Sequence, residues 1–328
     1  MRPTFWNEIA ANKRLSLFYC VLMALLLTGV GAAGGYLWEP ELWPFTAGIA
    51  AVIGIGVAIY ANTAGGNAIL SIAGAREATH EENQVYVNVA HEMSIAAGVP
   101  LPKLYILDEA SPNAFATGTK PENGVICVTT GLLERLDRNE LQGVVAHEMA
   151  HIRNYDIRLM TTLALTVGII VLMRDLFIRG RFHTGRRKSD GNGVVMIIAI
   201  VFILLAPVFA MLLRMAVSRN REYLADASAV QFTRYPEGLA NALQKIATAP
   251  DTQVDTANAG TAPMFIVDPL RAHNLEHESV GWFSTHPPTL ERISRLRAMG
   301  AQVGGEAAFD IPMQSENRTK SPAARIDD

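Results

Sequence analysis

The feature that most constrains this chain is the run of residues 15–38, which contains no charged side chain. About 20 apolar residues in a helix are enough to cross the hydrocarbon core of a bilayer, so this run is predicted to be a membrane-spanning helix. A second apolar run, residues 43–61, follows after a short loop. No small-residue cleavage site follows the first run, which argues against a signal peptide. The two runs predict a transmembrane hairpin over residues 1–62.

Two further apolar runs occur later in the chain, at residues 159–173 and 191–213. The earlier one is short for a span, because 15 helical residues cover roughly 22 Å of a core that is about 30 Å thick. A loop rich in arginine separates the two runs. Residues 159–213 are therefore predicted to be a second hydrophobic pair that either spans the membrane or re-enters it. Both arrangements leave the flanking residues on one side.

Charge gives the expected orientation and excludes one class of partner. Lys13 and Arg14 precede the first span, whereas the loop after it has no Lys or Arg. The positive-inside rule places the N-terminus and the polar region after the second span in the cytoplasm. A net charge of -3 is not typical of nucleic-acid-binding proteins, which neutralise phosphates. The lipid bilayer is a predicted partner and nucleic acid is not.

Between the hydrophobic pairs, the chain has the pattern of a mixed α and β domain. Helices are predicted over residues 81–97 and 138–154, the second one capped by Asp137. Short β-type runs lie at residues 103–107, 114–117 and 124–130. The predicted fold class is α+β, mainly α, with helical transmembrane segments and a small β-sheet.

The predicted helix at residues 138–154 contains His147-Glu148-Met149-Ala150-His151, which has the pattern H-E-x-x-H. Positions i and i+4 share one face of a helix, so both imidazoles can bind one zinc ion, and Glu148 lies beside a metal-bound water. The only two cysteines have no metal-site spacing. We therefore predict a zinc site built from histidine and carboxylate.

Residues 89–93 repeat the string V-A-H-E-M of residues 145–149. Ile95, however, occupies the position where the second histidine ligand is needed. His91 and Glu92 are therefore interpreted as ordinary residues on a helix surface.

Catalytic zinc usually has three protein ligands, so another is needed. Glu222, directly after the last apolar run, is the best candidate for it. Asp226 lies one helical turn further on and is expected to accept a hydrogen bond from a ligating histidine. Without the histidine pair, Glu222 and Asp226 would be read as a solvated helix face.

Four segments together, residues 147–151, 218–226, 112–118 and 284–288, resemble the HtpX-type membrane zinc metallopeptidases, relatives of the CAAX prenyl proteases. The resemblance extends from the N-terminus to about residue 299. It implies a zincin-like metallopeptidase domain in two parts, residues 63–158 and 214–299. The sequence departs from the family in its basic loop and in its tail at residues 300–328, which is expected to be disordered. The resemblance also implies endoproteolysis of misfolded or damaged proteins, in stress response and quality control, at the cytoplasmic face of a bacterial inner membrane.

The expected cofactor is one Zn²⁺ per chain, bound by His147, His151 and Glu222. Zinc lowers the pKa of its bound water and polarises the scissile carbonyl, while Glu148 takes the proton from that water. The resemblance also places His286 near the site, as a stabiliser of the oxyanion or as a turn residue before two prolines.

Asn113, Ala114 and Phe115 begin a segment that either binds substrate by main-chain pairing as an edge strand or is a plain β-strand. Protein or peptide substrates are expected, and the sequence specifies no oligomeric state. Two other functions stay open: a prenyl-protein processing protease, and a zinc-binding membrane scaffold or chaperone without turnover. A scaffold has no need of a general base, so it leaves Glu148 unexplained.

Overall fold

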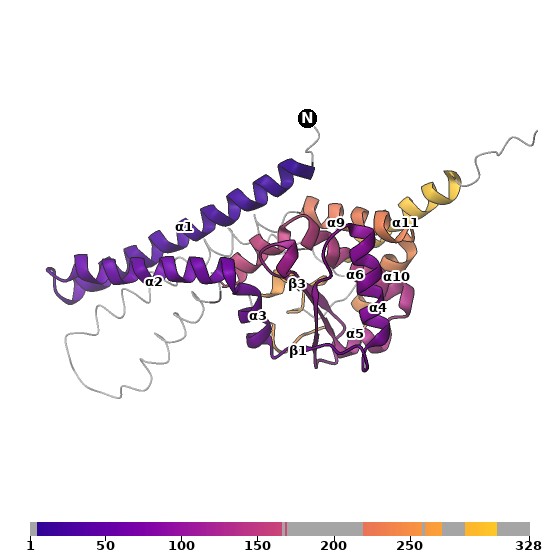
Figure 1. Ribbon diagram of the computed structural model, residues 1–328, viewed down its shortest axis with the longest axis horizontal. Helices are drawn as coiled ribbons and strands as arrows, with labels where there is room; N and C mark the ends of the chain where they lie inside the picture. Colours follow the sequence, from indigo (N-terminus) through magenta and orange to yellow (C-terminus); the bar gives the residue numbers. More distant parts are fainter. Residues whose placement is uncertain (1–4, 166–167, 169–218, 258–259, 271–285, 307–328) are drawn as a thin grey trace, which may run out of the picture.

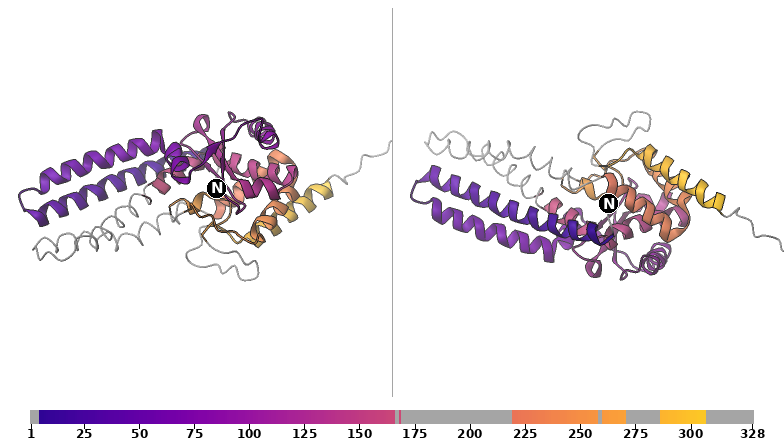
Figure 2. Two further views of the ribbon diagram at one scale, coloured as in Figure 1. Left: turned by 90° about the horizontal axis from the view of Figure 1, so that it is seen from below. Right: turned by 90° about the horizontal axis from the view of Figure 1, so that it is seen from above.

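The computed structural model describes residues 5–165, 168, 219–257, 260–270 and 286–306. Helices α1 (Phe5–Trp38) and α2 (Trp43–Thr63) form a hairpin that projects from the rest of the protein (Figure 1). The two views in Figure 2 show the same pair of helices side by side, with the start of α1 over the polar part of the molecule. Helix α1 begins ahead of its uncharged run, so its first turns are polar.

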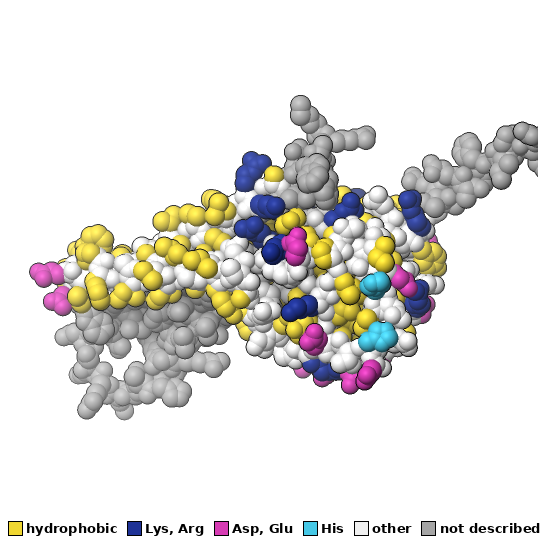
Figure 3. Space-filling view, in the orientation of Figure 1, with side chains coloured by type: hydrophobic (Ala, Val, Ile, Leu, Met, Phe, Trp, Pro, Cys, Tyr) yellow, Lys and Arg dark blue, Asp and Glu magenta, His cyan; other side chains and the backbone are white. Residues whose placement is uncertain are grey.

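The surface of the hairpin is that of a membrane protein. The segments Ala10–Gly29 and Trp43–Thr63 are long and apolar enough to cross a bilayer, and only 28% and 17% of them is buried in the protein. Large apolar side chains along them are exposed, among them Leu25 at 65% and Val52 at 72%. Figure 3 shows these apolar side chains along the hairpin, with basic side chains where it meets the polar domain. Lipid is the solvent that such a surface needs.

One four-stranded sheet organises the polar domain, with strand order β1-β2-β4-β3. Its strands are β1 (Arg76–Glu77), β2 (Lys103–Leu107), β3 (Ala114–Thr117) and β4 (Val125–Thr129). Strand β4 is parallel to β2 and antiparallel to β3. The three strands predicted from the sequence are confirmed, and β3 lies at an edge of the sheet.

Helices surround this sheet, and α6 lies between β3, β4 and three other helices (Figure 1). The helices of this domain are α3 (Gly65–Ala73), α4 (Gln84–Ala97), α5 (Thr130–Arg135), α6 (Arg138–Arg153), α9 (Arg219–Thr233), α10 (Pro236–Ala247) and α11 (Thr289–Glu306). The mainly helical α+β fold class is therefore confirmed.

The start of helix α6 is fixed by two capping residues, Asp137 and Glu140. The Asp137 carboxylate accepts the backbone N–H of Glu140 at 3.0 Å, and the Glu140 carboxylate accepts the backbone N–H of Asp137 at 2.9 Å. Lys245 of α10 is paired with Glu140 at 2.6 Å. Gly143 allows α10 to approach, since a Cβ there would lie 2.6 Å from the backbone nitrogen of Leu239. The cap and this crossing set the position of α6.

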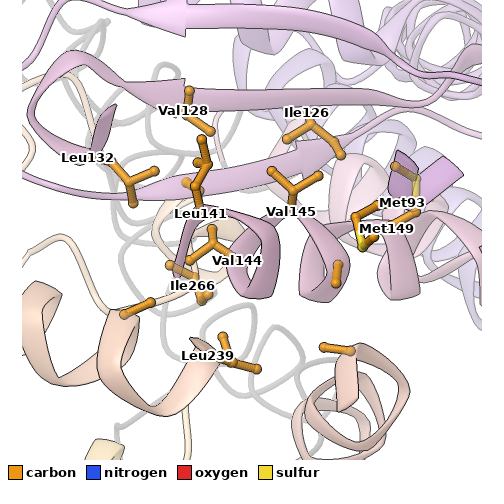
Figure 4. Close-up of a cluster of buried hydrophobic side chains, with 14 of the residues drawn as sticks. Met93, Ile126, Val128, Leu132, Leu141, Val144, Val145, Met149, Leu239 and Ile266 are labelled. Carbon is orange, nitrogen blue, oxygen red and sulfur yellow. The ribbon is translucent and has the colours of Figure 1, made fainter. Parts of the chain in front are cut away.

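The core of the domain lies on both sides of α6 (Figure 4). Val145 faces Ile126 of β4, while Val144 lies toward Leu239 of α10. All of these side chains are at most 1% exposed. Because apolar groups cover both of its faces, polar side chains on α6 are held in a dry environment.

Some predicted segments differ in their bounds or lie outside the described residues. Helix α11 continues through Gly300 to Glu306, within the tail at residues 300–328 that is predicted to be disordered, and residues 307–328 lie outside the described residues. Residues 156–165 are helical, but most of the predicted pair at residues 159–213 lies outside the described residues.

Candidate metal centre

Three side chains from two helices converge beside the edge strand. His147 and His151 lie one turn apart on α6, and Glu222 comes from α9. Their ligand atoms all lie within 4.8 Å of one another. The two imidazole Nε2 atoms are 3.2 Å apart, and each is 3.7 Å from a carboxylate oxygen of Glu222. The structure thus brings together the three residues that the sequence analysis predicts as ligands.

Each histidine is oriented by a carboxylate on its other ring nitrogen. The Nδ1 atom of His147 lies 3.0 Å from Asp226 of α9. The Nδ1 atom of His151 lies 3.0 Å from Asp156, which follows the end of α6. A carboxylate in this position accepts the Nδ1 proton and leaves the Nε2 lone pair free for a cation. Asp226 therefore lies where it was predicted, whereas the sequence analysis does not predict Asp156.

Arg292 of α11 is the largest fully buried side chain near the site, at 1% exposure. It donates two hydrogen bonds to Asp226, at 2.9 and 2.7 Å, and a third to the backbone carbonyl of Ile266 at 2.8 Å. The charge-assisted hydrogen bonds from Arg292 offset the free-energy cost of burying the Asp226 carboxylate. Burial opposes ionisation of Asp226, but the Arg292 charge holds the pKa of that carboxyl below its usual range.

The donor set fits a zinc ion. Two nitrogen ligands about 2.0 Å from a tetrahedral metal lie about 3.3 Å apart, close to the 3.2 Å between the two Nε2 atoms. Burial alone would raise the pKa of Glu222, yet the neighbouring His286 and His151 hold it well below its usual range. An anionic carboxylate and two neutral imidazoles are the ligands of catalytic zinc sites. These residues therefore suit a metal ion.

Glu148 lies beside this cluster, 1% exposed, and the polar group that interacts with its carboxylate from β3 is the backbone of Ala116. Burial raises the pKa of Glu148 to about 7. A carboxyl group with a pKa near neutrality both accepts and releases a proton at physiological pH. The Glu148 carboxyl is therefore suited to proton transfer.

The charge on His151 is governed by its neighbours. Burial lowers the pKa of His151, but the hydrogen bond to Asp156 and the charge of Glu222 outweigh this and raise it to about 9. At His147 the effect of burial prevails, and the pKa of this residue is lowered. A cation at the centre must therefore displace one proton, from His151.

His286 lies at the edge of the same cluster, just before α11. It is 7% exposed, and its Nδ1 atom is 3.6 Å from a Glu222 oxygen. The structure thus brings His286 to the site, as the resemblance implies.

The predicted substrate-binding residues lie at the start of edge strand β3. Asn113, Ala114 and Phe115 are buried beneath residues 265–267, with the backbone N–H of Ile266 donating to the Ala114 carbonyl at 2.9 Å. Phe115 also packs against Phe265, with ring centroids 4.9 Å apart. The cavity beside the cluster is only about 10 Å³, and from β3 it is lined by Ala116. Ala116 is therefore the strand residue nearest to the open space.

Residues 80–300 match the profile of the family described as Peptidase family M48. The chain belongs to this family. This M48 peptidase is 46% identical over 302 residues to a Dictyoglomus turgidum protein named Protease HtpX homolog, covering 92% of this chain and 97% of that protein. Proteins of the same name from Caldanaerobacter subterraneus and Listeria monocytogenes are 41% and 40% identical, over 91% and 90% of this chain and 99% of each relative.

A crystal structure of S. mikatae Ste24p is 20% identical to this M48 peptidase, with a TM-score of 0.47, and covers 89% of this chain and 66% of that one. That similarity is too distant to support a conclusion. The family and its HtpX relatives confirm the resemblance found in the sequence. The protein is a membrane metallopeptidase, as predicted.

Two further residues of the site in this M48 peptidase, Asp156 and Arg292, are not among those predicted from the sequence. A signal for Arg292 existed, because this charged residue adjoins Ile293 on the buried face of α11, which continues with Leu296. A charged residue on an apolar helix face needs a buried partner, and here Asp226 is that partner. Asp156 had no such signal, since an acidic residue after a helix is common on surfaces.

Proposed function

We propose that this protein is a zinc-dependent endopeptidase of the bacterial cytoplasmic membrane that hydrolyses misfolded or damaged membrane and cytoplasmic proteins. The observation that carries the proposal is the convergence of His147, His151 and Glu222 beside the buried carboxyl of Glu148. The M48 family and the HtpX relatives support peptide-bond hydrolysis.

His147, His151 and Glu222 would hold one zinc ion, with Asp226 and Asp156 orienting the two imidazoles. Zinc, when bound, supplies Lewis acidity for the scissile carbonyl and for the attacking water. Glu148 takes the proton of that water and passes it to the leaving amine, for which a pKa of about 7 is suitable. His286 is the candidate donor to the oxygen that becomes negatively charged.

The outer edge of β3, which residues 265 and 266 cover in part, is the proposed docking site for an extended substrate. The Ala114 carbonyl faces this edge, because it accepts a bond from Ile266. Backbone groups two residues apart in a strand point the same way, so Ala116 faces the same edge and is next to the metal ligands. Main-chain pairing at Ala116 gives little side-chain selectivity, which suits a protease of unfolded chains. Residues 263–266 have to move aside for such a substrate.

The proposed orientation places the active site in the cytoplasm. The start of α1 contacts the polar domain through Lys13, which lies over the Tyr155 ring at 4.2 Å. The start of α1 and the site thus lie at the same end of the hairpin. The basic side chains lie at this end too (Figure 3). Residues 63–158 and 214–299 would form one catalytic domain on this side, with residues 159–213 as a second hydrophobic pair.

The test compares full-length protein purified in detergent with Glu148→Gln and with Glu92→Gln, which changes the same residue in the repeated string. Casein cleavage and zinc per chain are measured for each. We expect zinc in all three proteins, but cleavage only by the wild type and Glu92→Gln. A wild-type protein without bound zinc would contradict the assignment of the metal ligands. Cleavage by Glu148→Gln would contradict the role of Glu148 as the general base.

A further inference from the structure

A turn after α6 places the carboxylate that orients His151. Residues 154 and 155 form this turn, and Asp156 begins the next helical segment. Tyr155 has a φ of 61°, a left-handed conformation that is disfavoured for any residue with a Cβ. Such a turn persists only where its surroundings hold it. The position of Asp156, and through it the orientation of His151, therefore depends on what contacts residues 154–156.

The contacts come from transmembrane helix α1. The side-chain amide of Asn12 donates to Asp156 at 2.6 Å and to the backbone carbonyl of Asn154 at 3.1 Å. Asn12 is 2% exposed and lies 144 positions before Asp156 in the sequence. One side chain of α1 thus binds both ends of the turn.

Two charged residues complete this arrangement. Lys13, next to Asn12, lies over the Tyr155 ring. The amide oxygen of Asn12 accepts a hydrogen bond from Arg221 at 2.9 Å, and Arg221 is the neighbour of the proposed ligand Glu222. The Asn12 amide is therefore fixed from its oxygen side as well, which sets the direction of its N–H bonds.

We propose that Asn12 is a positioning residue of the metal centre, so that helix α1 of the membrane hairpin sets the orientation of the ligand His151 through Asp156. The inference rests on the proposed zinc chemistry. A ligand held in the wrong orientation loses metal affinity and turnover, whereas substrate binding at β3 is not affected. A plain anchoring role for Asn12 would instead change only the stability of the protein.

Ser16 offers a matched control on the same helix. It is fully buried one turn further on, and its hydroxyl donates to the backbone carbonyl of Asn12 at 2.9 Å. Ser16→Ala therefore removes a buried hydrogen bond from α1 without touching the Asp156 carboxylate. Asn12→Ala removes the amide, and Asn12→Asp keeps its shape but replaces the donor with a carboxylate that repels Asp156.

The experiment uses full-length protein in detergent. Zinc affinity is measured by competition with a chelator, kcat and KM with a quenched fluorescent peptide, and Tm on the metal-free form. For Asn12→Ala and Asn12→Asp we expect zinc affinity to fall by about tenfold or more and kcat to fall, with KM within about twofold of the wild type. Ser16→Ala is expected to keep the wild-type zinc affinity, kcat and KM.

The outcomes separate this inference from the proposed function. If the wild type binds zinc and Asn12→Asp does so equally tightly with the same kcat, the positioning role is overturned and the proposed function stands. The role is also overturned if Ser16→Ala loses as much zinc affinity as Asn12→Ala, since any disturbance of α1 would then suffice. A wild type that binds no zinc overturns both.

Discussion

Helices α4 and α6 carry the same five-residue string, yet only one of them forms part of a metal centre. In α4 the Val, Ala and Met of the string are buried, while His91 is exposed and Glu92 is half-buried. In α6 all five are buried, including His147 and Glu148. The two helices pack against each other. The difference therefore comes not from the string but from the second histidine, which Ile95 replaces in α4, and from the surroundings of each helix.

The surroundings differ in two respects. Helix α4 is covered on one face only, so Glu92 pairs with Arg138 at the surface and keeps its hydration. Helix α6 is covered on both faces, and Glu222 of α9 meets its histidines. Burial and a third ligand turn a helix-surface pattern into a reactive site.

The largest expected effect tests the second ligand. His151→Ala removes a ligand from the cluster, so we expect loss of bound zinc and a fall in kcat of at least about a thousandfold, since a catalytic metal contributes several kcal/mol. His91→Ala is the matched control and should keep both. The two variants are compared by metal analysis and peptide hydrolysis. Equal losses in the two would show that α4 and α6 are not different in function.

The next effect concerns buried and exposed ion pairs. Arg292→Met leaves the Asp226 carboxylate buried without its partner, which is expected to cost about 3–5 kcal/mol of stability. Thermal unfolding of the metal-free protein measures this as a clearly lower Tm. A change in Tm no greater than that of a surface variant would mean that Asp226 is not held by Arg292.

A smaller effect is the pH dependence of zinc binding. The pKa of His151 is about 9, so the residue is protonated below that value and a cation has to displace the proton. Zinc affinity should therefore rise about tenfold per pH unit between pH 6 and 8, with about one proton released per ion, and level off above about pH 9. Calorimetry in two buffers of different ionisation enthalpy counts the protons. Affinity that is independent of pH over this range would contradict the assigned charge state.

The smallest effect is expected at the surface pair of α4. Arg138→Met removes the partner of Glu92, and both side chains are more than 40% exposed. Exposed ion pairs contribute at most about 1 kcal/mol, so the Tm should change little and hydrolysis not at all. The measurement is the same thermal scan as for Arg292→Met. A large loss of stability here would remove the contrast between the two helices.

The sequence predicts those parts of the fold whose signals are local. The cap at Asp137 and the apolar spacing of α6 predict that helix closely, and the uncharged runs predict the hairpin. Helix α3 was not predicted, because two glycines at its start resemble a loop. Strand β1 has only two residues and is defined by its pairing with β2.

At the site, local spacing predicts the histidine pair, and a carboxylate repeat at i and i+4 predicts Glu222 with Asp226. Residues that act across long separations were not predictable. Arg292 meets Asp226 only when α11 packs beside α9, and Asn12 reaches Asp156 from a different region of the chain. Their side chains are polar residues of ordinary type, and only the tertiary structure gives them partners.

The most direct test transfers the complete pattern from α6 to α4. Ile95→His gives α4 its own H-E-x-x-H, and combining it with His151→Ala removes that pattern from α6 in the same chain. Zinc per chain is then measured after dialysis. We expect none to remain, because α4 is exposed at Ile95 and has no third ligand among the described residues. One zinc ion per chain in this double variant would show that the H-E-x-x-H pattern alone makes the metal centre.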